Sequence, residues 1–170
     1  SLDHVAVLGN TIKLIAGEKA GIIKQGVPVV TAPQHPDALG VISGKASEQR
    51  SKLIESNSVV TINKEENLGL EGTNLELKTR NSTFSPHLRL LGRHQIENAT
   101  TAIAAICELE NIGITIDSTK TSNGIESVQW SARNQLVTTD PTPIFVDGAH
   151  NVDSARALRK SVEALFPHSK

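Results

Sequence analysis

The order of apolar runs along the chain constrains its fold more than any other feature. Short runs rich in β-branched residues alternate with stretches of helical apolar spacing, and this order predicts an α/β protein built from parallel βα units. We expect strands at residues 4–8, 27–31, 58–62, 134–139 and 144–147. We expect helices at residues 11–23, from 36 onward, and at 45–55, 94–110, 118–127 and 152–166. Between them, residues 64–90 are polar, and we expect hairpin strands there.

Lys19 is out of place in the first predicted helix, residues 11–23. It shares the helical phase of the apolar residues Ile12, Ile15 and Ile23, so the spacing puts it on or beside the core-facing stripe. A lysine there is costly unless it has a partner or has lost its charge. The alternative is that its aliphatic stem is buried while the ammonium reaches solvent, and spacing alone favours that alternative.

The composition excludes several classes of function. Apolar residues make up 38% and charged residues 21% of the chain, with a formal net charge of −1, so we expect no general attraction to nucleic acid or to a membrane surface. The apolar runs are too short to span a bilayer. Cys107 is the single cysteine, which fits a reducing compartment. We therefore expect a cytoplasmic protein.

Two further features concern what the sequence lacks. It contains no methionine, even at position 1, and we interpret it as a piece of a longer protein. A phosphate-binding loop needs Gly, four residues and then Gly-Lys-Ser/Thr, because a turn of backbone N–H groups must surround the phosphates. The nearest match, Gly40 to Ala46, has three intervening residues and no hydroxyl. We interpret it as a helix interrupted by glycine, and we expect the loop itself to precede Ser1.

Several short sequence motifs follow one another along the chain between residues 2 and 151. They are Asp3-His4, Leu8-Gly9, Glu18-Lys19-Ala20-Gly21-Ile22, Val27-Pro28-Val29, Leu91-Gly92-Arg93-His94-Gln95 with Asn98, Trp130 with Arg133, and Asp147-Gly148-Ala149-His150-Asn151. Together they resemble the folylpolyglutamate synthase and dihydrofolate synthase family of the Mur ligase superfamily. The resemblance implies an α/β fold with two parts. Residues 1–127 would form the second half of a Mur-ligase-type central ATPase domain, and residues 128–170 would begin a Rossmann-like C-terminal domain.

The resemblance also implies a catalytic metal site. The lysine that matches Lys19 is carbamylated in the family, and the histidine that matches His4 is a magnesium ligand. A carbamate turns a cation into an anionic oxygen ligand, which suits the hard Mg²⁺ ion. This would explain the charge of Lys19 on an apolar stripe. Without the resemblance, His4 is more simply interpreted as a histidine at the end of a strand.

Four other residues match nucleotide-binding positions of the family. Asn98 would hydrogen-bond the adenine, since an amide offers both a donor and an acceptor. Arg133 would contact the ATP phosphates, which a guanidinium fork suits. Asp147 would bind the ribose hydroxyls and His150 the phosphates, at the carboxyl end of a predicted parallel strand, where ligands usually bind in open α/β sheets. On spacing alone, Asn98 is more simply interpreted as a polar residue near the start of a helix, where such residues are common. Arg133 could likewise be a solvated surface arginine.

The segment around Arg133 departs from the family's motif, which is usually Trp-Pro-Gly/Ala-Arg followed by an apolar residue. Ser131 replaces the proline, and Asn134 stands where the apolar residue is usual. We therefore expect a looser turn that keeps its arginine. After Asp147, we interpret Asn151 as a helix N-cap rather than as a ligand.

The activity that the resemblance implies is an ATP-dependent amide ligation with ATP and Mg²⁺ as cofactors. L-glutamate would be joined to a folate or dihydropteroate carboxylate through an acyl phosphate, giving ADP and phosphate. We expect a monomer whose partners are these small molecules, and we expect this chain to be inactive alone. Whether the first or later glutamates are added stays open. The alternatives are another Mur-type ligase of cell-wall synthesis and a degenerate, non-catalytic nucleotide-binding module.

Overall fold

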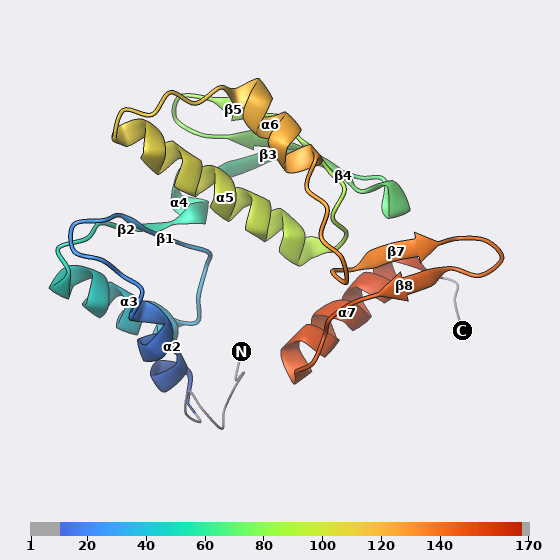
Figure 1. The fold of residues 1–170 in the computed structure, drawn as a ribbon, viewed down its shortest axis with the longest axis horizontal. Helices are drawn as coiled ribbons and strands as arrows, with labels where there is room; N and C mark the ends of the chain where they lie inside the picture. The colour runs from blue at the N-terminus through green and yellow to red at the C-terminus, as the bar shows by residue number, and fades with distance from the viewer. Residues whose placement is uncertain (1–10, 168–170) are drawn as a thin grey trace. The chain divides into compact units, whose positions relative to one another are not determined.

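The computed structural model describes residues 11–167 and contains both helices and strands (Figure 1). The chain divides into two compact units, residues 1–59 and residues 60–170. The predicted domain boundary near Ser127 lies within the second unit and stays a prediction. No helix among residues 11–167 is long and apolar enough to cross a membrane.

The first unit is a small α/β arrangement. Its described elements are α2 (Ile12–Ala20), β1 (Val29–Thr31), α3 (Pro36–Glu48), β2 (Leu53–Glu55) and α4 (Ser56–Val59). Strands β1 and β2 pair in parallel, with Val30 opposite Ile54, which confirms a parallel βα unit in this part of the chain. The helix predicted at residues 45–55 was wrong in its second half. Ile54 is 3% exposed, and its β-branched side chain packs in a strand that pairs with β1.

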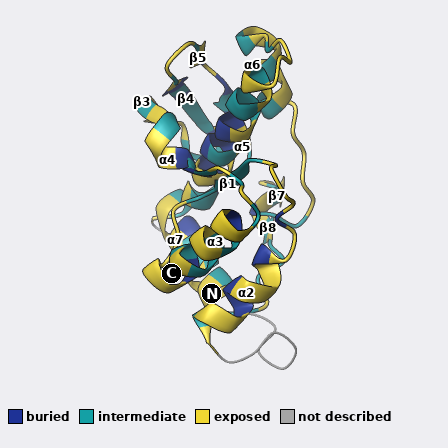
Figure 2. Cartoon of the chain, turned by 90° about the vertical axis from the view of Figure 1, so that its left-hand side faces the viewer, coloured by how far each residue is buried: buried dark blue, intermediate teal, exposed yellow. Residues whose placement is uncertain are grey.

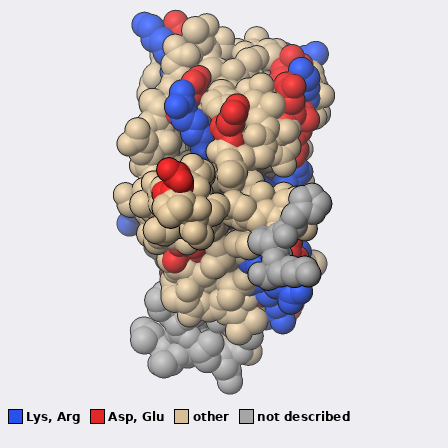
Figure 3. Space-filling model, turned by 90° about the vertical axis from the view of Figure 1, so that its right-hand side faces the viewer, with Lys and Arg blue, Asp and Glu red and all other residues tan. Residues whose placement is uncertain are grey.

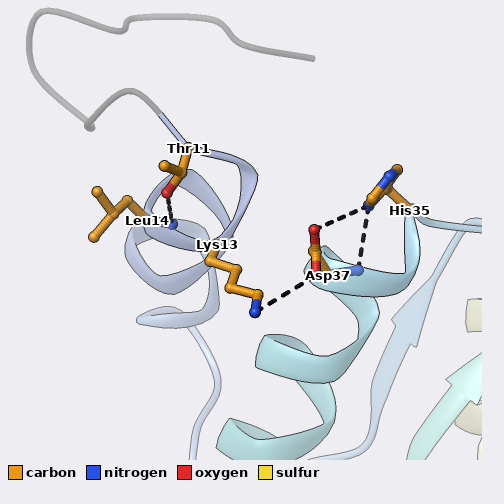
Figure 4. Close-up of polar contacts among 5 residues, drawn as sticks. All are labelled: Thr11, Lys13, Leu14, His35 and Asp37. Atoms are coloured by element: carbon orange, nitrogen blue, oxygen red, sulfur yellow. Dashed lines mark hydrogen bonds and ion pairs between the residues drawn. The ribbon is translucent and has the colours of Figure 1, made fainter.

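The starts of α2 and α3 are held by side-chain caps (Figure 4). The Thr11 hydroxyl accepts a hydrogen bond of 3.3 Å from the backbone N–H of Leu14, and His35 Nδ1 accepts one of 3.2 Å from the N–H of Asp37. Each cap satisfies an N–H that has no partner within its helix. Lys13 Nζ lies 3.6 Å from Asp37 Oδ1, but both side chains are exposed and the pair contributes little to stability.

The segment that most resembled a phosphate loop is helical. Helix α3 runs from Pro36 to Glu48 without a break and includes Gly40 and Gly44, so the expected interruption at glycine does not occur. Glycine inside a helix costs about 0.5–1 kcal/mol relative to alanine, and a helix of this length tolerates it. Residues 40–46 are therefore not a phosphate-binding loop, as predicted.

The second unit begins with an antiparallel sheet. Its elements up to the long helix are β3 (Thr61–Asn67), η1 (Gly69–Glu71), β4 (Thr73–Lys78), β5 (Thr83–Phe84) and β6 (His87–Leu88). Strand β4 pairs with β3, β5 and β6, always antiparallel. The hairpins predicted for residues 64–90 are confirmed. The strand expected at residues 58–62 was wrong in position, since α4 occupies its start and β3 begins at Thr61.

The core of this unit lies between the sheet and helix α5 (Arg93–Asn111). Figures 1 and 2 both place α5 beside the strands. Leu77 and Phe84 on the sheet and Ile103 on the helix are each 0% exposed. Burying a side chain of this size stabilises the fold by about 1.5–3 kcal/mol. Helix α6 (Ser118–Glu126) packs near β5, where the N–H of Ser85 donates to the Ser122 hydroxyl at 3.0 Å.

The last elements are β7 (Gln135–Thr138), β8 (Ile144–Val146) and α7 (Val152–Leu165). Strands β7 and β8 pair antiparallel. The expectation that Asp147 ends a parallel strand was therefore wrong, because the two predicted strands form a hairpin with each other. On the face drawn in Figure 3, Lys and Arg form small groups interspersed with Asp and Glu.

Candidate functional site

A pocket of about 290 Å³ in the second unit collects polar side chains from separate segments of the chain. It brings together three of the predicted nucleotide-binding residues, Arg133, Asp147 and His150, and adds His94 and Asn134. The segments are the start of α5, the turn before β7, and the turn between β8 and α7. The pocket thus joins residues on both sides of the predicted domain boundary.

Arg133 is held in place by its own turn. Its Cζ atom lies 5.4 Å from the centre of the Trp130 ring, a distance at which a guanidinium is attracted to the ring face. Its Nη1 atom donates to the Ala132 carbonyl at 3.5 Å. A Cβ atom at Gly148 would lie 2.7 Å from that Nη1, so glycine is what lets the next turn of the pocket approach the guanidinium so closely.

Asp147 is bonded to the same turn. Its Oδ2 atom accepts a hydrogen bond of 2.8 Å from the backbone N–H of Asn134. Beside it, the N–H of Gly148 donates to the Ala132 carbonyl at 2.8 Å. These two bonds tie the turn that carries Arg133 to the end of β8. An ionised carboxylate has acceptor capacity beyond one hydrogen bond, so Asp147 can also accept from hydroxyl groups of a ligand.

His150 lies at the start of α7. Its Nδ1 atom is 2.8 Å from the Gly148 carbonyl oxygen. A carbonyl oxygen can only accept, so Nδ1 carries a proton. Asn151 is the N-cap of α7, where its side chain and that of Ser154 form a capping box. This confirms the N-cap interpretation of Asn151.

The pocket therefore has the chemistry of an anion site next to a hydroxyl site. The positive end of the α7 dipole and the Arg133 guanidinium both favour negative charge, while Asp147 favours hydroxyl donors. His94, half-buried on the first turn of α5, adds an imidazole ring to the lining of the pocket. A ligand that carries both phosphate and sugar hydroxyls fits this arrangement.

Comparison with known proteins gives the family. No protein-family model matches the chain. The dihydrofolate synthase/folylpolyglutamate synthase of Bacillus subtilis is 37% identical over 171 residues, covering 99% of this chain and 39% of the relative. The folylpolyglutamate synthase of Lacticaseibacillus casei is 31% identical and covers 98% of this chain and 39% of the relative.

Solved structures agree. An FPGS–AMPPCP–folate complex matches with a TM-score of 0.89 at 30% identity, covering 98% of this chain and 40% of that chain. The Mycobacterium tuberculosis folylpolyglutamate synthase complexed with ADP matches with a TM-score of 0.85 at 29% identity, covering 98% of this chain and 37% of that chain.

The chain belongs to the folylpolyglutamate synthase and dihydrofolate synthase family. It spans about two fifths of the length of the curated relatives that it matches. The α/β fold predicted from the sequence motifs is confirmed by these structures.

In this chain, Asn98 does not line the pocket. It lies on α5 one turn after His94 and is exposed, and its Nδ2 atom donates to Oε1 of the buried Gln95 at 3.0 Å. Its role at the adenine stays a prediction.

Lys19 is exposed in the last turn of α2. Its ammonium therefore reaches solvent, as the spacing favoured, but the burial of its aliphatic stem was wrongly predicted. Helical phase predicts which face of the helix a residue lies on, but the burial of that residue depends on what packs against the face. The residues of α2 that are buried are Ile15, Ala16 and Ala20. A solvated lysine at a helix C-terminus is favourable, since it interacts with the negative end of the helix dipole. Its carbamylation therefore rests on the family resemblance alone.

The described residues do not by themselves make a magnesium site. Within residues 11–167, no group of three His, Cys, Asp or Glu side chains is placed to hold a metal ion. His4, the other predicted metal ligand, lies outside the described residues. The magnesium site, like both of its predicted ligands, stays a prediction.

Proposed function

We propose that this chain contributes the later part of the ATP site of a ligase that joins L-glutamate to a folate or dihydropteroate carboxylate. The convergence of Arg133, Asp147 and His150 in one pocket is the observation that carries the proposal. Relatives named folylpolyglutamate synthase or dihydrofolate synthase match along nearly the whole chain, and the neighbours solved with AMPPCP or ADP support a nucleotide as the ligand.

Each pocket residue has a role that its chemistry supports. Arg133 binds phosphate oxygens through its planar fork of donors, and Asp147 accepts from the ribose hydroxyls. His150 assists at the phosphates. Because its Nδ1 proton is directed to the Gly148 carbonyl, a bond from the ring to a phosphate oxygen requires a second proton, on Nε2. Asn98, which lies outside the pocket on α5, contacts the adenine in this proposal.

The proposed reaction has two steps. The substrate carboxylate attacks the γ-phosphorus of ATP, so the bond to the β-phosphate oxygen breaks and ADP leaves, giving an acyl phosphate. The amine of L-glutamate then attacks the acyl carbon, an amide bond forms, and inorganic phosphate departs. His4 and carbamylated Lys19 would hold magnesium, which would offset negative charge on the phosphates.

The remaining partners follow from this activity. We propose a cytoplasmic monomer that acts on small molecules, ATP, L-glutamate and a pterin-bearing acid, with no nucleic-acid or membrane partner. The chain holds about two fifths of a relative's length, and we propose that it does not turn over alone.

A ligation assay tests the proposal. The full-length enzyme that contains this chain is mixed with ATP, Mg²⁺ and L-glutamate and supplied in turn with dihydropteroate, tetrahydrofolate and a muramyl precursor, and ADP release is measured. We expect release only with dihydropteroate or tetrahydrofolate. Release with the muramyl precursor alone would support a cell-wall ligase, and nucleotide binding without any release would support the non-catalytic module. Measurable turnover by the 170-residue chain would contradict its proposed inactivity.

A further inference from the structure

Asn134 is the most completely buried polar residue of the pocket, at 2% exposure. Its backbone has φ of 45°, a left-handed conformation that asparagine adopts more readily than most residues. The NH₂ group of its side-chain amide donates two hydrogen bonds, one to the Leu91 carbonyl at 2.9 Å and one to the Ser161 hydroxyl at 2.9 Å. Both protons of that NH₂ group are thus hydrogen-bonded.

These bonds join parts of the chain that are far apart in sequence. Leu91 directly precedes the turn into α5, which carries His94, and Ser161 lies on α7. The backbone N–H of Asn134 meanwhile donates to Asp147 Oδ2. One residue therefore links the turn of Arg133 to the start of α5, to α7 and to the end of β8.

The arrangement carries a cost. The carbonyl oxygen Oδ1 of Asn134 is buried, and among the described residues it accepts no hydrogen bond, which is unfavourable for a polar atom removed from water. An apolar residue, which the family's motif usually has at this position, would avoid the cost of burying an unpaired carbonyl oxygen. It could not, however, bond the Leu91 carbonyl. Local rules of stability are broken most often at functional sites.

We propose that Asn134 is a positioning residue for the nucleotide site. Its amide fixes the adjacent Arg133, and with it Asp147, relative to the helix that bears His94. A binding group acts well only when its support is held to within a fraction of an ångström, and the residue after Arg133 is held here at both its backbone and its side chain. The inference rests on the proposed function.

Enzyme kinetics of the full-length ligase test it. Asn134→Ala removes both donors, and Ser161→Ala removes one acceptor while the bond to Leu91 remains. We expect the KM for ATP to rise about tenfold in the first and less in the second, with kcat and the KM for L-glutamate changed by less than about threefold. The Kd for ADP, measured by calorimetry on the same proteins, should rise in parallel. Phe84→Leu, a change in the core away from the pocket, is the control for lost stability, with the melting temperature measured for each variant.

The decisive comparison uses Arg133→Ala as a second background. If Asn134 acts through Arg133, the effect of Asn134→Ala on the KM for ATP should shrink to less than about threefold there, because residues that share one role are not additive. An effect of the same size in both backgrounds would overturn the inference, as would an unchanged KM for ATP and Kd for ADP. A wild-type enzyme that binds ADP but ligates nothing would refute the proposed function instead, and the Kd comparison would still decide the role of Asn134.

Discussion

Replacing Gly92 with alanine tests whether the pocket is packed as the structure shows. Gly92 has φ of 104°, and an added Cβ would lie 2.6 Å from Asn134 Nδ2, 2.8 Å from His94 Cε1 and 2.8 Å from the Ser161 hydroxyl. The Asn134 amide cannot move freely, because it is buried and its NH₂ group is hydrogen-bonded to the Leu91 carbonyl and to the Ser161 hydroxyl. Gly113 is a matched control, since it has φ of 90° but nothing within 4 Å of its added Cβ.

The two substitutions should therefore differ by the steric term alone. Each incurs backbone strain of about 1–3 kcal/mol. Gly92→Ala adds overpacking of about 1–3 kcal/mol, which corresponds to a further fall in melting temperature of roughly 2–4 °C per kcal/mol for a chain of this size. Urea unfolding followed by circular dichroism measures both free energies. Equal destabilisation by the two variants would refute the packing described around Gly92.

Three other measurements address single features of the fold. Gly40→Ala and Gly44→Ala should each stabilise the chain by about 0.5–1 kcal/mol, since both lie inside α3 with open space at the added Cβ; destabilisation in thermal melts would argue against the helix. The hydrogen bond from Asn74 and then the charge of Lys64 lower the pKa of Glu66 from its ordinary value of 4.5. The stabilisation from this carboxylate is thus present above pH 4.5 and lost as the pH falls below it, and Asn74→Ala should raise the pKa in an NMR titration, where an unchanged value would contradict the contact. Burial raises the pKa of the Cys107 thiol, so its reaction with a disulfide reagent at pH 8 should be slower than that of free cysteine and should accelerate in urea; equal rates would mean that the thiol is exposed.

Local signals in the sequence were sufficient for several elements. The helix beginning near His94 has a long apolar stripe and was predicted to within a residue or two, as was the N-cap at Asn151, whose chemistry is local. The glycines at 40 and 44 were correctly excluded as a phosphate loop, because that loop needs a spacing that the chain does not have.

Features that depend on packing between distant segments were not predictable in the same way. The burial of the Lys19 stem was inferred from helical phase, but phase does not say which neighbour covers a helix face. The partner of the strand ending at Asp147 was inferred to be parallel, and the hairpin with residues 135–138 depends on pairing that spacing does not encode. The importance of Asn134 was visible only as a departure from the family's usual apolar residue, and its bonds to Leu91 and α7 required the structure.

We propose that Arg133 and Asp147 bind the same nucleotide, and calorimetric titration of ADP into the full-length enzyme tests this. Arg133→Ala and Asp147→Asn are compared with Arg156→Ala, an exposed arginine on α7 that pairs with Asp153. We expect the first two to raise the Kd for ADP at least about tenfold, which corresponds to about 1.4 kcal/mol, and the third to leave it within twofold. Unchanged affinity in both pocket variants would mean that these residues do not bind the nucleotide.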